Sequence, residues 1–284
     1  MLGFYNINKP TGATSTQMVS LVKRVTHNKC GHLGTLDPMA SGVLPVAVGK
    51  ATKLFDWFLN KDKKYYAIGL FGVLTDTLDA EGTVQQKQEV EVTKQQIDNI
   101  IHNFKGKIQQ IPPLYSSVSI NGSRAYDLAR QGKDFQLPTR SVNIYNVECV
   151  GQIEKNLFAF NIHCSAGTYV RSLILDIAKK LGTIATTVCI IRMASGPFNM
   201  DTSYTPEQVI NNQAELITID KVIDLPKINL QSDLANKLLN GQTPKISKEN
   251  GKYLCYTNNT IMGIAKVEDS KIKLEINLWE NAND

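Results

Sequence analysis

Apolar residues recur along the chain with two spacings, one typical of strands and one typical of helices. The first spacing predicts strands over Gly3–Ile7, Val43–Val48, Lys64–Gly72, Arg140–Gln152, Asn156–Cys164 and Thr186–Met193. The second predicts helices over Lys50–Leu59, Thr93–Phe104, Ser123–Arg130 and Thr168–Leu181, and one near the N-terminus that Thr14 or Ser15 caps. Because strands and helices mix without regular alternation, we expect an α+β fold rather than a doubly wound sheet.

The stretch from Gly31 to Lys53 combines turn formers, one aspartate and an apolar run. The run, Val43–Val48, is typical of a buried strand. Pro45 inside it predicts an edge strand or a bulge, because proline cannot donate to the ladder. Asp37 therefore lies on a loop pinned by a strand behind it, and Pro38 restricts its backbone. A carboxylate on a glycine-rich loop is most often a turn former.

The pattern changes near Pro226, which follows a helical stretch. From there a compact, lysine-rich segment runs to the C-terminus, with strands expected near Tyr253–Tyr256 and Thr260–Val267. We therefore expect two domains, residues 1–225 and residues 226–284.

The composition is ordinary for a globular protein, with 42% hydrophobic and 20% charged residues. No run of about 18 apolar residues occurs, so no membrane span is expected. The first residues lack the basic flank and apolar core of a signal peptide. The five cysteines are scattered and form no CxxC pair, which predicts neither a disulfide framework nor a zinc site. We therefore expect a protein of the reducing cytoplasm.

Positive charge is concentrated at the start of the chain. Residues 1–64 contain nine Lys or Arg, three Asp and no Glu, a net of +6, whereas the whole chain has +5. A solvated basic face and an electrostatic footprint for a phosphate backbone both fit this distribution. Charge alone leaves the two interpretations open.

Six segments carry a resemblance to a known family. The longest is GHLGTLDPMASGVLPVAVGKATKL, and the others are NINKPTGATS, DKKYYAIGLFGVLTDTLDAEG, PPLYSSVSINGSRAYDLARQG, CSAGTYVRSLILDIAKKLG and TTVCIIRMASGPF. In this order they resemble the tRNA pseudouridine-55 synthases of the TruB type. The resemblance implies a mixed, mostly antiparallel sheet with an active-site cleft across it. It also implies that the C-terminal segment, with LANKLLNGQ, is a small, mostly-β PUA-like RNA-binding domain.

The same resemblance assigns the residues of the cleft. It implies that Asp37 is the catalytic carboxylate and that Arg171 lies beside it. It places Tyr169 in the active site, within reach of the base, and gives Ile190 the position that closes the base pocket. Tyr65 matches the tyrosine that stacks on the target base. Without the family motifs, Arg171, Tyr169 and Ile190 would each be taken for an ordinary core or surface residue.

A further role concerns flipping of the base. The target uridine is stacked in the T-arm loop of tRNA and must leave the stack before chemistry. The resemblance implies that His32 fills the space that the base leaves. Thr75–Gly82, rich in Asp and Thr, is expected to be a surface loop. We expect no catalytic role for its acids, Asp76 and Asp79.

The implied function is isomerisation of uridine to pseudouridine at position 55 of tRNA, with the T-arm stem-loop as partner. The sequence has no GxGxxG, no GxxxxGK[ST] and no His/Cys cluster with metal spacing, so neither cofactor nor metal is expected, and no obligate protein partner is evident. One rival is an RNA-binding module that lacks catalysis, which would not need a carboxylate facing phosphates. The other is a carboxylate-pair glycosidase, which needs two acids flanking a bond, whereas the motif supplies one.

Overall fold

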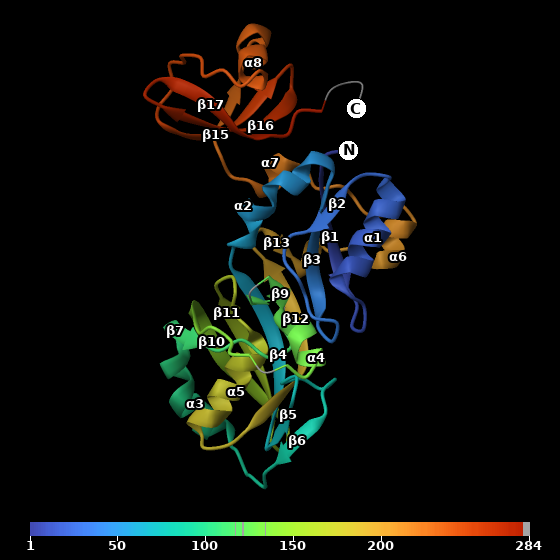
Figure 1. The fold of residues 1–284 in the computed structure, drawn as a ribbon, viewed down its shortest axis with the longest axis vertical. Coiled ribbons are helices and arrows are strands. Elements are labelled where there is room, and N and C mark those ends of the chain that lie inside the picture. The colour runs from blue at the N-terminus through green and yellow to red at the C-terminus, as the bar shows by residue number, and fades with distance from the viewer. Residues whose placement is uncertain (117, 121, 134, 281–284) are drawn as a thin grey trace.

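The computed structural model describes residues 1–116, 118–120, 122–133 and 135–280. A large sheet forms the body of the molecule (Figure 1). Its strands follow in the order β1 (Gly3–Lys9), β3 (Ser41–Val48), β12 (Ala185–Ser195), β4 (Lys63–Phe71), β11 (Leu157–Cys164), β10 (Arg140–Glu154) and β7 (Gly106–Gln110). Every neighbouring pair on this path is antiparallel except β3 and β12. The expected α+β class with a mostly antiparallel sheet is confirmed.

Strand β3 is buried on both faces, which explains its continuous apolar run. Leu44 and Val46 face the main core, whereas Val43 and Ala47 face a second apolar cluster. The expectation of an edge or bulge at Pro45 is wrong, because β1 pairs with β3 in unbroken register. On the other side of β3, the short strand β2 (Cys30–His32) pairs only with residues 46–48, and β12 pairs only with Ser41 and Gly42. The proline therefore lies in the gap between two partial neighbours, where a missing donor costs least.

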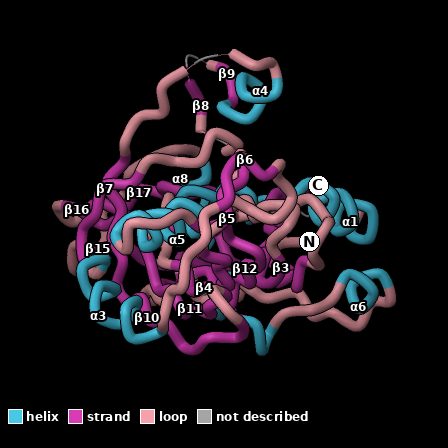
Figure 2. The backbone as a smooth tube through the Cα atoms, turned by 90° about the horizontal axis from the view of Figure 1, so that it is seen from below, coloured by secondary structure: helices cyan, strands magenta, loops and turns pink. Residues whose placement is uncertain are grey.

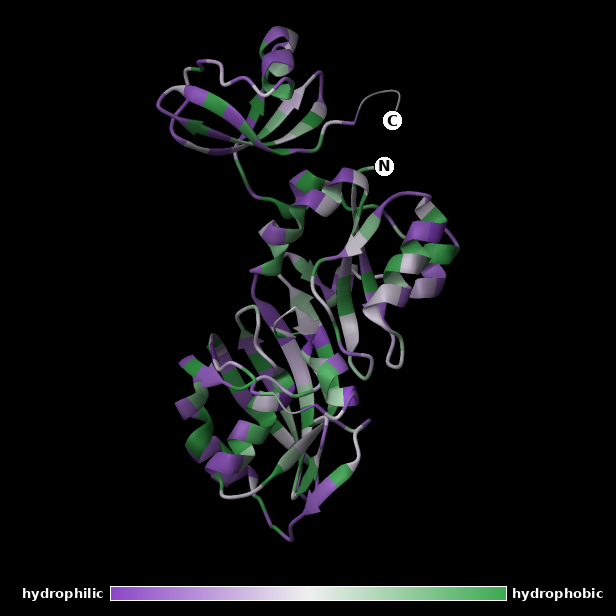
Figure 3. Cartoon of the chain, in the orientation of Figure 1, coloured by the Kyte–Doolittle hydropathy of each residue, from purple (hydrophilic) through white to green (hydrophobic). Residues whose placement is uncertain are grey.

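Four helices cover one face of the sheet and complete the main core. They are α1 (Ser15–Thr26), α3 (Lys94–Ile101), α5 (Val170–Lys180) and α6 (Pro206–Ile210). A capping box starts α1 at Thr14 and α3 at Thr93, where the sequence predicted the helices to begin. In Figure 3 the ribbons of α1 and α3 change between hydrophobic green and hydrophilic purple within each turn, as expected for helices with one buried side.

Three predicted helices differ in detail from the structure. The segment predicted as Lys50–Leu59 is a 3-10 turn, Gly49–Leu54, followed by α2 (Phe55–Leu59). The helix expected over Ser123–Arg130 begins with a hairpin strand and becomes α4 only at Ala125–Arg130. The dipeptide Asn121-Gly122 also predicts a turn before this helix, and Asn121 lies outside the described residues. Helix α5 begins at Val170, because the preceding segment turns at Gly167 with a positive φ of 79°.

Two small hairpins extend from this body. One is formed by β5 (Val73–Thr75) and β6 (Val84–Lys87), the other by β8 (Ser119–Ile120) and β9 (Ser123–Arg124). Figure 2 shows β8, β9 and α4 projecting away from the sheet, beyond α5. Within the described ranges, no helix is both long and apolar enough to cross a membrane.

The C-terminal part is a second sheet with its own core. Its strands are β14 (Lys227–Asn229), β15 (Gly251–Thr257), β16 (Thr260–Glu268) and β17 (Lys271–Asn277), and α8 (Ser232–Leu239) packs beside them. This sheet lies at one end of the molecule, beyond α7 (Ile219–Val222) (Figure 1). Its apolar side shares the second cluster with β1 and β3. The predicted strand-rich C-terminal region is thus confirmed, whereas the boundary at residue 225 and an RNA-binding role stay predictions.

Candidate active site

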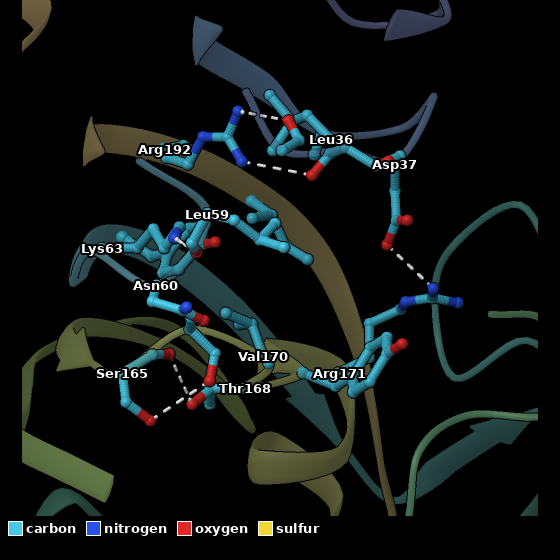
Figure 4. A pocket seen from close by; sticks show the side chains of 18 of the residues that line it. Leu36, Asp37, Leu59, Asn60, Lys63, Ser165, Thr168, Val170, Arg171 and Arg192 are labelled. Carbon is cyan, nitrogen blue, oxygen red and sulfur yellow. Dashed lines mark hydrogen bonds and ion pairs between the residues drawn. The ribbon is translucent and has the colours of Figure 1, made fainter. Parts of the chain in front are cut away.

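A cavity of about 440 Å³ opens where the loop that carries Asp37 faces the start of α5. Its walls come from the loop 34–40, the first residues of β4, the turn and helix start at 165–171, and β12. Figure 4 shows Asp37 and Arg171 pointing toward each other in this cavity. Five of the six expected site residues line it: Asp37, Tyr65, Tyr169, Arg171 and Ile190.

The Asp37 loop is held from behind by a buried lysine. The Lys9 ammonium group, 0% exposed, donates to the carbonyl oxygens of Pro38 at 3.2 Å and Ala13 at 2.6 Å. The backbone N–H of Gly12 also donates to Pro38, at 2.9 Å. Burial lowers the pKa of Lys9 to about 8, and the charge of Asp37 opposes this shift. No sequence signal selected Lys9, although it stands in the segment NINKPTGATS.

The carboxylate of Asp37 and the guanidinium of Arg171 form an ion pair at 2.8 Å. The Asp37 side chain is 37% exposed, so it can meet a substrate, whereas that of Arg171 is 4% exposed. Arg171 also donates to the carbonyl oxygens of Thr77 at 2.7 Å and Tyr115 at 3.0 Å. A guanidinium held this rigidly stabilises a negative charge on the carboxylate beside it.

Arg171 contacts a second carboxylate that the sequence did not predict. Asp79 lies 3.1 Å from its guanidinium and has a 6% exposed side chain. The Thr77 hydroxyl and the Glu81 N–H donate to Asp79 at 2.6 and 3.1 Å and fix its orientation. The expectation of a surface loop is therefore wrong at Asp79, because its charge is buried against an arginine. The only available signal was that a buried arginine needs acidic partners, and no spacing rule selects an acid 92 residues away.

Tyr65 and Ile190 reach the cavity from adjacent strands, β4 and β12. In the register of these strands Tyr65 stands opposite Arg192, and Ile190 stands opposite Ala67. Burial raises the pKa of Tyr65 to about 12, with Arg192 opposing the shift, so the phenol stays protonated at neutral pH. The neighbouring Tyr66 is not part of the cavity wall, which agrees with the choice of Tyr65.

Arg192 is a cavity residue that sequence analysis missed. It is 1% exposed, and its guanidinium donates to the carbonyl oxygens of Val43 at 2.7 Å and of Thr35 and Gly34 at 3.2 Å each. It thereby ties the Asp37 loop to β12, and Figure 4 shows its bonds to that loop. Lys63 lies in the same wall; burial, reinforced by the charge of Arg192, lowers its pKa to about 8.

His32 is not among the residues that line the cavity. It lies on β2 opposite Val46, five residues before Asp37 in the chain. Burial and then the charge of Arg192 lower its pKa, so the imidazole is neutral at neutral pH. Its Nδ1 atom is buried, and no partner for it exists among the described residues. The structure thus leaves His32 beside the cavity, without the contacts that would assign it a role.

The chemistry available in this cavity is that of the Asp37 carboxylate, two buried guanidinium groups, the buried amine of Lys63 and two tyrosines. No group of three or more His, Cys, Asp or Glu side chains that could hold a metal ion occurs in the described part of the chain.

Comparison with known proteins adds relatives that span almost the whole chain. A tRNA pseudouridine synthase B of Caldanaerobacter subterraneus subsp. tengcongensis is 37% identical over 276 residues, which cover 95% of this chain and 97% of the relative. A protein of the same name from Thermosipho melanesiensis is 36% identical, covering 98% of this chain and 95% of the relative. One from Clostridium perfringens is 39% identical, covering 97% and 98%.

Solved structures share the fold. A chain of a Cbf5–Nop10–Gar1 complex superposes with a TM-score of 0.72 at 25% identity, over 98% of this chain and 85% of that chain. A chain of an H/ACA RNP bound to a substrate RNA containing 2′-deoxyuridine gives a TM-score of 0.71 at 23% identity, over 99% and 86%. The second likeness concerns the fold alone.

The sequence pattern of a family points the same way as these relatives. Residues 23–170 match the N-terminal domain of the TruB family of pseudouridylate synthases. This match covers the Asp37 loop, β4 and the acidic loop with Asp79, and the relatives extend it over the rest of the chain. The chain therefore belongs to the TruB family of pseudouridylate synthases.

Proposed function

We propose that this protein isomerises uridine to pseudouridine at position 55 in the T-arm loop of tRNA, with Asp37 as the catalytic carboxylate. One observation carries the proposal. The half-exposed carboxylate of Asp37 pairs with buried Arg171 in a cavity that Tyr65, Tyr169 and Ile190 also line. The name shared by the relatives, tRNA pseudouridine synthase B, supplies the reaction class and the kind of RNA.

The reaction needs a carboxylate but no redox chemistry. The N1–C1′ bond breaks, the ring turns, and a C5–C1′ bond forms; the proton on C5 leaves and N1 gains one. Asp37 serves this reaction as a nucleophile at C1′, as a nucleophile at C6, or as a base toward the ribose. All three routes require the ionised carboxylate, which the guanidinium of Arg171 stabilises at 2.8 Å.

The tyrosines and Ile190 give the base a place to bind. We assign Tyr65 to stacking, because its protonated ring offers an uncharged π-face, and such stacking contributes about 1–3 kcal/mol per base. Tyr169 borders the base from the start of α5, and Ile190, 4% exposed, provides an apolar wall from β12. A base in this pocket lies next to Asp37.

His32 fits the space that the flipped base leaves in the T-arm loop. Its neutral ring offers a flat face that can stack between bases. We also propose that residues 226–284 form a PUA-like RNA-binding domain and residues 1–225 the catalytic domain. The four-stranded sheet with its own core supports this division.

The test uses an unmodified tRNA labelled with tritium at C5 of uridine 55. The expected result is tritium release together with pseudouridine at position 55 in a chemical map of the RNA. The controls are a tRNA that carries tritium at C5 of every uridine but has cytidine at position 55, and the variant Asp37→Asn with the original RNA; both should release no tritium. Tight binding without release would support a binding module, and free uracil would support a hydrolase; either result overturns the proposal.

A further inference from the structure

A buried amide side chain holds the backbone of Tyr169. Gln110 is the last residue of β7 and is 1% exposed. Its Oε1 accepts from the Tyr169 N–H at 2.8 Å, and its Nε2 donates to the Tyr169 carbonyl oxygen at 3.0 Å. The orientation of the amide is fixed, because a backbone N–H can only donate and a carbonyl can only accept. One side chain thus pairs with both backbone groups of a residue 59 positions away.

The pairing occurs where the backbone direction matters most. Tyr169 is the N-cap residue of α5, with φ −99° and ψ 112°, and its own side chain makes no capping bond. Its carbonyl also accepts the first bond of the helix, from Leu173 at 3.1 Å. Gln110 therefore sets the angle at which the chain enters α5, and with it the position of Arg171 two residues later.

The neighbouring contacts follow the same pattern. The Ser172 hydroxyl donates to the Ile111 carbonyl at 2.7 Å, and Arg171 donates to the Tyr115 carbonyl at 3.0 Å. Consecutive residues of the α5 start are therefore bound to the segment that follows β7. Of these contacts, only the one made by Gln110 comes from a side chain outside the helix.

We propose that Gln110 is a positioning residue, which acts through Tyr169 and Arg171 to hold the ring and the guanidinium where the reaction needs them. This inference rests on the proposed function. A misplacement of about 1 Å at a catalytic group can cost about 100-fold in rate, so a two-point hold on the backbone matters more than its stability contribution suggests.

A second amide side chain, that of Asn156, also bonds to two backbone groups, and it lies far from the cavity. It therefore supplies a control. The side chain of Asn156 donates to the Val90 carbonyl at 2.7 Å and accepts from the Val92 N–H at 2.9 Å. Asn156 has a positive φ of 58°, which glycine also adopts without strain. Gln110→Met and Asn156→Gly therefore each remove a two-point amide contact without adding charge.

The experiment measures single-turnover rate, RNA dissociation constant and melting temperature with an unmodified T-arm stem-loop. We expect Gln110→Met to slow the rate about 10- to 100-fold. Its dissociation constant should stay within about threefold, because phosphate contacts dominate affinity. Asn156→Gly should lower the melting temperature and leave the rate unchanged. Gln110→Asn, whose shorter amide can still reach one backbone group, should give an intermediate rate and covers the case in which the methionine variant does not fold.

Equal rates for wild type and the Gln110 variants, or equal rate losses in the Gln110 and Asn156 variants, would overturn the positioning role. A wild-type protein that makes no pseudouridine would instead refute the proposed function, so the two failures are distinguishable.

Discussion

The cavity contains two buried arginines with opposite surroundings. Arg171 faces two carboxylates, Asp37 at 2.8 Å and Asp79 at 3.1 Å. Arg192 donates to three carbonyl oxygens and makes no ion pair among the described residues. The first arginine balances charge and holds a reactive group, whereas the second shapes the backbone of the loop that carries that group. The same type of side chain thus supports the proposed reaction at one end of the cavity and the local backbone structure at the other end.

The surplus of charge at the Arg192 end also affects its neighbours. After burial, the charge of Arg192 is the next cause that lowers the pKa of both Lys63 and His32. At the Arg171 end, two carboxylates face one cation. An anionic RNA entering the cavity therefore meets positive charge at one end and an excess of carboxylates at the other.

The largest expected effect is the loss of activity when the carboxylate of Asp37 is removed while the residues that hold it stay in place. Asp37→Asn should reduce pseudouridine formation by at least about four orders of magnitude, as removal of a catalytic group does in other enzymes. Affinity for tRNA should stay within about tenfold, because phosphate contacts position the RNA. The fold should persist, since Arg171 keeps Asp79 and two carbonyl partners. Asp56→Asn on the exposed side of α2 is the matched control, and measurable turnover by pure Asp37→Asn would contradict the assignment.

The second prediction contrasts the two arginines directly. Arg171→Met should lower the free energy of unfolding by about 3–5 kcal/mol, because it leaves the buried charge of Asp79 without a cation. Adding Asp79→Asn should recover part of that loss, because it removes the buried carboxylate that no longer has a cation beside it. The same Asp79→Asn change should not rescue Arg192→Met, whose cost arises from carbonyl groups. Urea unfolding of the single and double variants gives both coupling energies. Equal coupling of Asp79 to both arginines would remove the distinction between them.

These buried charges mark the limit of what the sequence could predict. The strands β1, β3, β10 and β11 and the capped helix α1 followed from spacing and capping residues, because those signals are local. The partners of Arg171 come from segments more than 50 positions away, and no local pattern identifies them.

Two misjudged positions have the same origin. Pro45 indicated an edge strand, but β3 is internal, and only the three-dimensional arrangement places the proline between two partial neighbours. Asp79 lies in a segment with the composition of a surface loop, and its burial depends on a helix that folds against it. The cavity residues Asp37, Tyr65, Tyr169, Arg171 and Ile190 were found through the family resemblance, since spacing alone does not select them.

The third prediction concerns the aromatic ring at the Arg192 end. Tyr65→Phe keeps the stacking face, whereas Tyr65→Ala removes it, and stacking contributes about 1–3 kcal/mol per base. If stacking is the role of Tyr65, the phenylalanine variant should retain most of the wild-type kcat/KM and the alanine variant should lose about 10- to 100-fold. Tyr66→Ala, on the opposite face of β4, is the control. Equal inactivity of the phenylalanine and alanine variants would instead give the hydroxyl a part in proton transfer.

The smallest expected effect is a pH dependence of the free energy of unfolding, caused by Lys63 at the Arg192 end of the cavity. Burial and the charge of Arg192 lower the pKa of Lys63 from 10.5 to about 8 in the folded protein. Between these values the unfolded chain binds more protons, so this lysine makes the free energy of unfolding rise with pH from about 8 to about 10. The increment between pH 7 and pH 10 should be about 2–3 kcal/mol, because each pKa unit of difference within this window contributes about 1.4 kcal/mol.

Urea unfolding at pH 7 and pH 10 measures the increment as the difference between wild type and Lys63→Met. Taking this difference cancels the contribution of the cysteines to the pH dependence. Their raised pKa values make the free energy of unfolding fall with pH over part of this window. Lys64→Met, at the exposed neighbour on β4, is the control and should keep the wild-type slope. In an Arg192→Met background the pKa of Lys63 should rise, because one repelling charge is gone, and the increment should shrink. An unchanged increment there would show that burial alone sets the pKa of Lys63, and that Arg192 shapes the loop without acting on its neighbours.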